Sequence, residues 1–327
     1  MKIRWLTLLL AIGLAAEASG DTIYATWAYA GDASSLTHFD SATPWLFKDP
    51  LPPEVQVPPV TIDFDPVTRK IWGFDYSDCQ IPVCPPLNDP VVIDPLTGAW
   101  SFVPLPGLNL HEFVLTDRDI DPLTRELRHF TGPTGNASYS FDRLQDRYDA
   151  PLHPVIGVTA LAHRQPTSAS QGVETYAIGP SPRTGPKVRG EPWFQLARIG
   201  GPGGTPPASS GEVTIIGPVD VDAERLWFDI SADGTAYLAA LVFAPPYNDE
   251  YKLYRVDLTS GALVEIGLIA QPGGSAILCG ISVAPPGLGE GVVAIPALSR
   301  VGLGLFALAL GTAALRVAGR KRVAASV

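Results

Sequence analysis

The sequence predicts an all-β protein, and three observations carry this prediction. The 327 residues include 33 prolines and 32 glycines, spread along the chain in a way that disfavours long helices. Short runs rich in Val, Ile, Tyr, Phe and Trp alternate with turn-forming clusters, as in proteins built from many short strands. A hairpin-like motif also recurs, which indicates repeated units.

The first 20 residues have the order of features that defines a signal peptide. Lys2 and Arg4 precede an apolar stretch from Leu6 to Ala16, and small residues follow up to Gly20. Signal peptidase cleaves after small residues of this kind, so segment 1–20 is predicted to be removed on export. The alternative is a short buried strand or helix at the N-terminus.

The body of the chain is much more acidic than the whole. The formal charge of −10 comes from 23 basic and 33 acidic residues. Seven of these basic residues and one acidic residue lie in 1–20 and 295–327, so 21–294 carries a net charge of −16. Such a body repels nucleic acid and anionic lipid headgroups and attracts cations or basic surfaces. The simpler explanation of this negative charge is that it keeps the protein soluble outside the cell.

The recurring motif is a turn of the form Asp-Pro-x-Thr between two apolar stretches. It occurs in 62–74, 91–103 and 118–130, and related Asp-led turns lie in 227–239 and 254–267. Asp accepts hydrogen bonds from backbone N–H groups two or three residues on, and Pro presets φ for a turn. Each segment is therefore predicted to form a strand, a tight turn and a strand.

A longer unit repeats as well, in the order aromatic strand, loop, and strand ending in an Asp-led turn. Segment 22–44 resembles 235–261 in this way, and 70–76 with 90–98 keeps the same order. Segments 174–180 and 194–201 form a looser copy. Four aromatic residues mark the units: Tyr24, Trp72, Tyr176 and Tyr237. Units of roughly 40–60 residues predict a β-propeller of about five or six blades over 21–284. A β-sandwich or two small β-domains is the alternative.

The C-terminal segment has the composition of one transmembrane helix. Val301 to Leu315 carries no charge, and with Val317 to Gly319 the stretch reaches about 19 residues, or roughly 28 Å as a helix. Arg320, Lys321 and Arg322 then form a basic stop that favours the cytoplasmic side. We expect 285–294 to be a linker, 295–322 the anchoring segment and 323–327 a cytoplasmic tail, with the body outside the cytoplasm.

The body resembles a family of exported bacterial domains that are propeller-like and of unknown function. Segments 228–241, 252–267 and 277–284 are similar to its closing repeats, and 60–75 with 91–98 to its early ones. The resemblance covers 227–284 well and 22–160 in patches, whereas 161–212 departs from the pattern. It implies a fold and an exported location, and no activity.

The tail resembles the IPTL-type C-terminal protein-sorting signals, which are relatives of the PEP-type signals. The match consists of the motif "IPALS", the apolar span and the basic end. Ile295, Pro296, Leu298 and Ser299 fit the motif, while Ala297 replaces the usual Thr. The resemblance implies recognition by an exosortase-like membrane peptidase, cleavage near the motif and release to the cell surface or extracellular matrix. Without cleavage the same helix is a permanent inner-membrane anchor.

Cysteines and acidic residues give two further expectations. Cys79 and Cys84 are close enough in sequence to close a small disulfide loop in an oxidising compartment, while Cys279 fits a buried thiol. Asp117, Asp119 and Asp121 alternate, so on a strand they would share one face and could bind calcium. The competing role for Asp121 is that of the turn residue of its repeat.

Composition and motifs leave two functions open. The first is an exported, cell-surface β-propeller that serves as a binding or structural module, with an extracellular glycan or protein as partner and with exposed tryptophans for stacking. Core packing between blades is the other role for these tryptophans. The second function is a hydrolase or lyase with a metal-assisted acidic site in the central channel, which requires carboxylates or histidines to converge from several blades.

Overall fold

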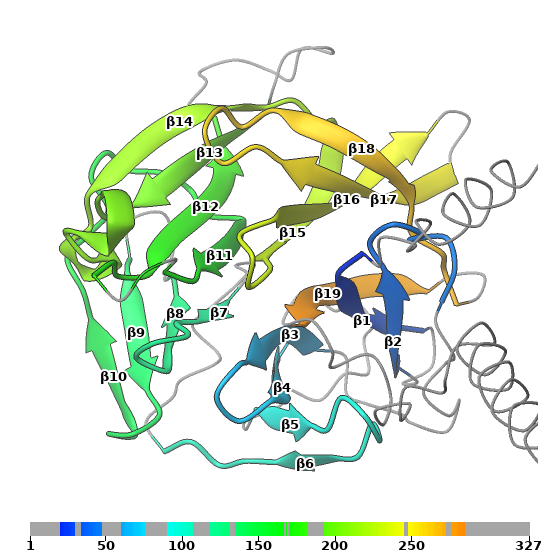
Figure 1. Ribbon diagram of the computed structural model, residues 1–327, viewed down its shortest axis with the longest axis horizontal. Helices are drawn as coiled ribbons and strands as arrows, with labels where there is room; N and C mark the ends of the chain where they lie inside the picture. The colour runs from blue at the N-terminus through cyan, green and yellow to red at the C-terminus, as the bar shows by residue number, and fades with distance from the viewer. Residues whose placement is uncertain are drawn as a thin grey trace, which may run out of the picture. The chain divides into compact units, whose positions relative to one another are not determined.

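The computed structural model describes residues 20–29, 34–47, 60–75, 90–106, 118–130, 135–166, 168, 170–181, 193–244, 248–272 and 276–284. Within these ranges the chain forms 19 strands and two short 3₁₀ helices, η2 (Pro202–Gly204) and η3 (Ala208–Ser210). The strands make five antiparallel sheets arranged as the blades of a β-propeller (Figure 1). The predicted all-β class and the propeller are therefore confirmed, with five blades.

Several predicted features lie outside the described residues. They are the signal peptide up to residue 19, Cys79 and Cys84, Asp117, the linker 285–294, the motif 295–299 and the basic stop 320–322. In the part of the chain that is described, no helix has the length and apolar character needed to span a membrane.

Four blades consist of four consecutive strands, numbered outward from the centre. Blade 2 contains β3 (Val60–Asp65), β4 (Lys70–Asp75), β5 (Val91–Ile93) and β6 (Trp100–Phe102). Blade 3 contains β7 (Asp119–Ile120), β8 (Glu126–His129), β9 (Ala137–Ser140) and β10 (Gln145–Tyr148). Blade 4 contains β11 (Ala160–Arg164), β12 (Glu174–Pro180), β13 (Phe194–Ile199) and β14 (Val213–Val219). Blade 5 contains β15 (Ala223–Ile230), β16 (Ala236–Ala244), β17 (Asn248–Val256) and β18 (Leu263–Leu268).

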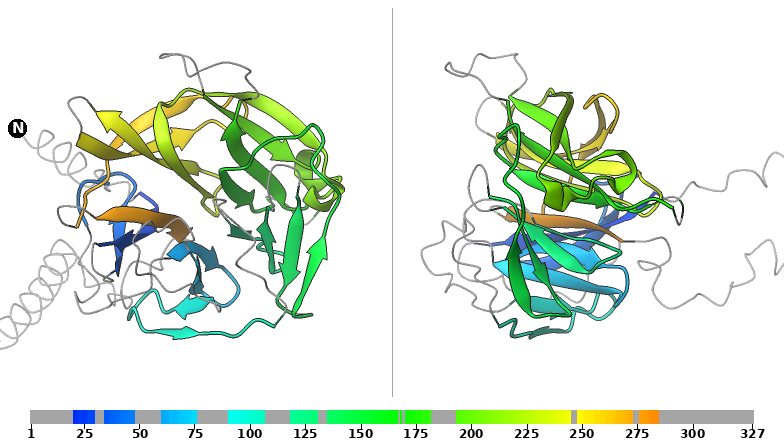
Figure 2. Two further views of the ribbon diagram at one scale, coloured as in Figure 1. Left: turned by 180° about the vertical axis from the view of Figure 1, so that it is seen from behind. Right: turned by 90° about the vertical axis from the view of Figure 1, so that its left-hand side faces the viewer.

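Blade 1 joins the two ends of the described chain. It consists of β19 (Ile277–Ala284), β1 (Thr22–Ala28) and β2 (Ser34–Asp40), with β19 innermost. The antiparallel register places Ile23 opposite Val283 and Ala25 opposite Ile281. Each innermost strand contacts the next, in the order β3, β7, β11, β15, β19 and back to β3. The inner strands thus form a closed ring around one axis (Figure 2).

The Asp-Pro-x-Thr segments form the predicted hairpin turns. In each of the three, the Asp Oδ1 accepts hydrogen bonds from the second and third backbone N–H groups after it, as Asp65 does from Val67 at 2.9 Å and Thr68 at 3.3 Å. The fifth residue donates its N–H to the Asp carbonyl at 2.8 Å and has a positive φ. The motif joins β3 to β4 and β7 to β8, but also β5 to β6. The motif therefore marks single hairpins, and one blade can contain two of them.

The four aromatic residues that mark the repeated units occupy the same strand position in their blades. Tyr24, Trp72, Tyr176 and Tyr237 lie on β1, β4, β12 and β16, each of which is the second strand from the axis. All four side chains are buried. The looser copy in 174–201 thus forms β12 and β13 of blade 4, and the segment that departs from the family pattern, 161–212, supplies these two strands and most of β11.

Apolar clusters fill the five seams between neighbouring blades. Each cluster combines side chains from two blades, as where Tyr24 and Leu36 of blade 1 meet Val60 and Ile71 of blade 2. The other seams hold equivalent clusters, which include Trp72 with Leu127, Phe130 with Leu161, Ile178 with Phe228, and Trp227 with Trp27. Trp27, Trp72 and Trp227 are therefore core residues, whereas Trp45 and Trp100 are 52% and 38% exposed.

The turn geometry predicts opposite effects for two substitutions. Arg69 has a φ of 57° and an exposed side chain, so Arg69→Gly should raise the free energy of unfolding by about 0.5–1 kcal/mol. Gly98 occupies the equivalent position with a φ of 69°, so Gly98→Ala should lower it by about 1 kcal/mol. Urea denaturation measures both, and a stabilised Gly98→Ala variant would contradict this account of the turn.

Candidate functional site

Four titratable side chains from four blades meet at the axis of the propeller. Asp63 lies on β3, Asp119 on β7, His163 on β11 and Asp229 on β15. All four side chains are buried, and together they form the floor of an axial pocket of about 30 Å³. A space of this size holds roughly two small heavy atoms. The convergence of carboxylates and a histidine required by the second functional hypothesis therefore exists in this chain.

The rim of the axial pocket is built from the residues that follow these strands. Pro66, Pro122, Gln165 and Ala232 occur two or three positions after the four floor residues. Ala232 is exposed and the other three are partly buried, so the pocket leads from the surface toward the buried floor. Phe64, Ile120 and Ile230 also border the pocket, but each directly follows a floor residue on its strand, and their side chains are buried in the apolar clusters between the blades.

The floor carboxylates also connect successive blades. Asp63 accepts a hydrogen bond from the N–H of Ile120 on the next inner strand, β7. Asp119 accepts one from the N–H of His163 on β11. Asp229 accepts one from the N–H of Val283 on β19. Each bond spans two blades, so these side chains hold three of the five seams at the axis.

His163 has one ring nitrogen against a carboxylate and the other without a partner. Its Nδ1 lies 2.9 Å from Asp119 Oδ2, although the direction departs from that of an ideal hydrogen bond. We assign the proton to Nδ1 from this contact. The Nε2 atom is buried, and no group among the described residues forms a hydrogen bond with it. A neutral His163 thus offers a lone pair beside three carboxylates.

Burial moves the pKa values of the floor residues in opposite directions. It raises the pKa of Asp229 to about 6 and raises that of Asp63 well above its usual range, where Asp119 and Asp229 add repulsion. It lowers the pKa of His163 to about 4, because a charged imidazolium loses its hydration. Among the described residues that line the axial pocket, none is Lys or Arg.

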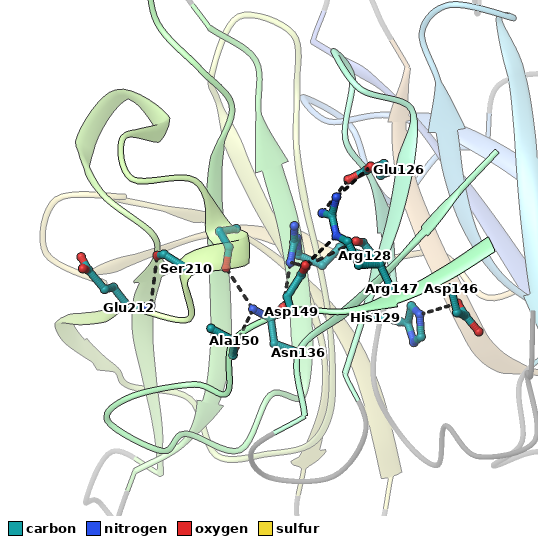
Figure 3. A network of polar contacts seen from close by, with 12 residues as sticks. Glu126, Arg128, His129, Asn136, Asp146, Arg147, Asp149, Ala150, Ser210 and Glu212 are labelled. Atoms are coloured by element: carbon teal, nitrogen blue, oxygen red, sulfur yellow. Dashed lines mark hydrogen bonds and ion pairs between the residues drawn. The ribbon is translucent and has the colours of Figure 1, made fainter. Parts of the chain in front are cut away.

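A second polar network lies in blade 3 and has a structural role (Figure 3). The guanidinium of the buried Arg128 donates to Asn136 Oδ1 at 2.7 Å and to Asp149 Oδ2 at 3.0 Å. Asn136 in turn donates to the carbonyl of Ala208 in η3 at 2.9 Å. Arg147 donates to Asp149 Oδ1 at 2.8 Å. The network connects β8, β9 and the end of β10 to the segment that precedes β14.

The structure separates the predicted metal candidates. Asp119 belongs to the axial floor, while Asp121 accepts hydrogen bonds from Leu123 and Thr124 in the turn after β7. Because β7 ends at Ile120, these two aspartates do not share a strand face. In the described part of the chain, no three His, Cys, Asp or Glu side chains are grouped as a metal-binding set. Cys279, predicted as a buried thiol, is fully buried in β19.

Asp119 was one of the metal candidates that the sequence indicated, whereas His163 and Asp229 were not singled out. A signal for all four was present, because each lies within the last three residues of its inner strand. Aligning the first strand of every blade would have placed the four residues in one column. The turn sequences differ too much for that alignment to be found from the Asp-Pro motif alone.

No protein-family model matches the sequence, and no curated protein matches it significantly. Solved structures that resemble the fold include the tricorn protease, at 13% identity and a TM-score of 0.35 over 76% of this chain. Another is the GH74 enzyme of Niastella koreensis, at 13% identity and a TM-score of 0.36 over 76% of this chain. The chain spans 26% and 37% of the lengths of these two proteins. A protein from Bacteroides uniformis matches over 78% of this chain and 83% of its own, with 12% identity and a TM-score of 0.36.

The opposite pKa shifts predict opposite effects of pH on two variants. Asp229 binds its proton more tightly when folded, so its contribution to stability is present below pH 3.8 and is lost as pH rises to about 6. His163 binds its proton less tightly when folded, so its contribution is present above pH 6.5 and is lost as pH falls to about 4. Between pH 4 and 6 the unmodified protein loses the Asp229 contribution as pH rises, so Asp229→Asn should become more stable relative to it. Over the same range the unmodified protein gains the His163 contribution, so His163→Asn should become less stable relative to it.

Urea denaturation at several pH values between these limits measures the two differences. Asp142→Asn, at an exposed turn, controls for the loss of a carboxylate as such. Two variants with the same pH trend would contradict the assignment of these shifts.

Proposed function

We propose that this protein is an exported β-propeller that acts as a binding or structural module at the cell surface. The observation that carries the binding role is the axial pocket, which has a partly apolar rim and a buried acidic floor. Its carboxylates already receive backbone hydrogen bonds from the neighbouring strands, so they are held in place before any ligand arrives. Such preorganisation favours binding, because little side-chain freedom remains to be lost.

The location is argued from the two ends of the sequence. The segment 1–20 would be removed by signal peptidase, which leaves the acidic body outside the cytoplasm. The apolar helix that follows "IPALS" would hold the protein in the inner membrane, with Arg320 to Arg322 inside. An exosortase-like peptidase would then release the body to the cell surface or matrix. An extracellular glycan or protein is the partner that this location offers.

Mass spectrometry of the protein isolated from its own host tests this proposal. We expect an N-terminus between residues 18 and 21 and a C-terminus near Ile295–Ser299. A mature chain that keeps residues 301–327 would show that the tail is a permanent anchor. A chain that also keeps residues 1–20 would contradict export.

One observation favours the second function, a hydrolase or lyase with its site at the axis. The Asp119–His163 pair has the arrangement of a general base, in which a carboxylate orients Nδ1 and Nε2 is left to take a proton. The low pKa of His163 keeps it neutral near pH 7, which is the form that accepts a proton. Metal assistance would require the floor carboxylates to draw together around a divalent cation, because the described side chains are not grouped as a metal-binding set.

A hydrolysis assay distinguishes this function from pure binding. Nitrophenyl esters and glycosides serve as chromogenic probes, with and without added calcium chloride. If the axis is catalytic, His163→Ala should abolish the activity of the full chain while Asp142→Asn leaves it unchanged. Activity that persists in His163→Ala would exclude the histidine as the base.

A further inference from the structure

The rim and the floor of the axial pocket differ in chemistry, and this difference restricts the ligand. The rim presents the apolar rings of Pro66 and Pro122 together with Ala232. The floor presents carboxylates and an imidazole. A ligand that fits both must carry an apolar stem and a small, hydrogen-bonding tip. A hydrated metal ion matches the floor but gains nothing from the apolar rim.

The floor selects a tip that donates hydrogen bonds and carries positive charge. His163 Nε2 is a buried acceptor without a partner, and the carboxylates of Asp63 and Asp229 keep lone pairs beyond those used by backbone N–H groups. A primary ammonium has three N–H donors, which is the number needed to reach one nitrogen and two carboxylates. Its charge would also offset the repulsion between the buried carboxylates.

The size of the pocket separates the two cationic side chains. About 30 Å³ accommodates an ammonium and roughly one methylene, but a planar guanidinium with its five N–H donors needs more room. The remaining methylenes of a lysine would lie against the prolines of the rim, as lysine stems do on apolar surfaces. The net charge of −16 on 21–294 would attract a basic partner toward the molecule before contact.

We propose that the axial pocket receives the ammonium group of a lysine side chain from a basic partner protein. The inference rests on the proposed function as a binding module and names the chemistry of the ligand. Asp63 and Asp229 bind the charge, His163 Nε2 accepts one hydrogen bond, and Asp119 acts as a positioning residue that fixes the histidine tautomer.

Calorimetry with the full chain tests the proposal, using a short lysine-containing peptide as the probe. We expect the peptide to bind, and the same peptide with an acetylated lysine or with arginine instead to bind at least about tenfold more weakly. Asp229→Asn should weaken binding of the lysine peptide by a similar factor, whereas the exposed Asp142→Asn should leave it unchanged. Equal affinity for the lysine and acetyl-lysine peptides would overturn the proposal.

A second variant leaves the floor and its backbone hydrogen bonds intact. Gln165→Lys places a lysine at the rim, where its own ammonium can enter the pocket and compete with the peptide. We expect this variant to remain folded by circular dichroism and to lose binding, while Asp142→Lys, which adds a lysine at an exposed turn outside the pocket, retains it. If both variants bind equally well, the peptide does not use this pocket and the proposal fails.

Separate outcomes distinguish this inference from the broader function. Binding of calcium or zinc chloride with no response to the lysine peptide would make the pocket a metal site. Absence of any lysine binding in a protein that is nevertheless processed and exported would overturn this inference alone. Retention of residues 1–20 in the host would instead overturn the proposed function, whatever the peptide does.

Discussion

The hydrogen bond between the carboxylate of one inner strand and the backbone of the next is the interaction on which this propeller depends. Asp63, Asp119 and Asp229 each form it, across sequence separations of 57, 44 and 54 residues. Apolar clusters fill the seams farther from the axis, but the hydrophobic effect that stabilises them is non-directional. The hydrogen bonds of the carboxylates are directional, so they fix how the inner strands of neighbouring blades are positioned along the axis.

This way of joining blades carries an electrostatic cost. Three buried carboxylates around one axis repel one another, and burial disfavours their charged forms. The protein offsets part of this cost with backbone N–H donors, two of which point at Asp229 from Ile230 and Val283. In the proposed role, a bound ammonium would offset the repulsion that remains. Assembly and recognition thus draw on the same side chains.

Closure of the ring depends on a strand from the far end of the described chain. β19 supplies the inner strand of blade 1 and lies between β1 and the inner strands of blades 2 and 5. Without it, β1 would present an open edge toward the axis, and the carboxylate of Asp229 would lose the Val283 N–H. Blade 1 is therefore completed only when the end of the described chain pairs with its beginning.

The sequence by itself determined the local structure of this protein. Asp65, Asp94 and Asp121 direct their turns through hydrogen bonds only two or three residues long, so the hairpins could be predicted without knowledge of the rest. The aromatic residues of the second strands could be recognised as a repeat for a similar reason, although for the tryptophans the sequence left open whether they pack between blades or stack on a ligand. Only the tertiary structure decided that there are five blades, and that His163 and Asp229 meet Asp63 and Asp119 at the axis. The physical reason is that these contacts join strands tens of residues apart, and their geometry comes from the closure of the ring rather than from any local pattern.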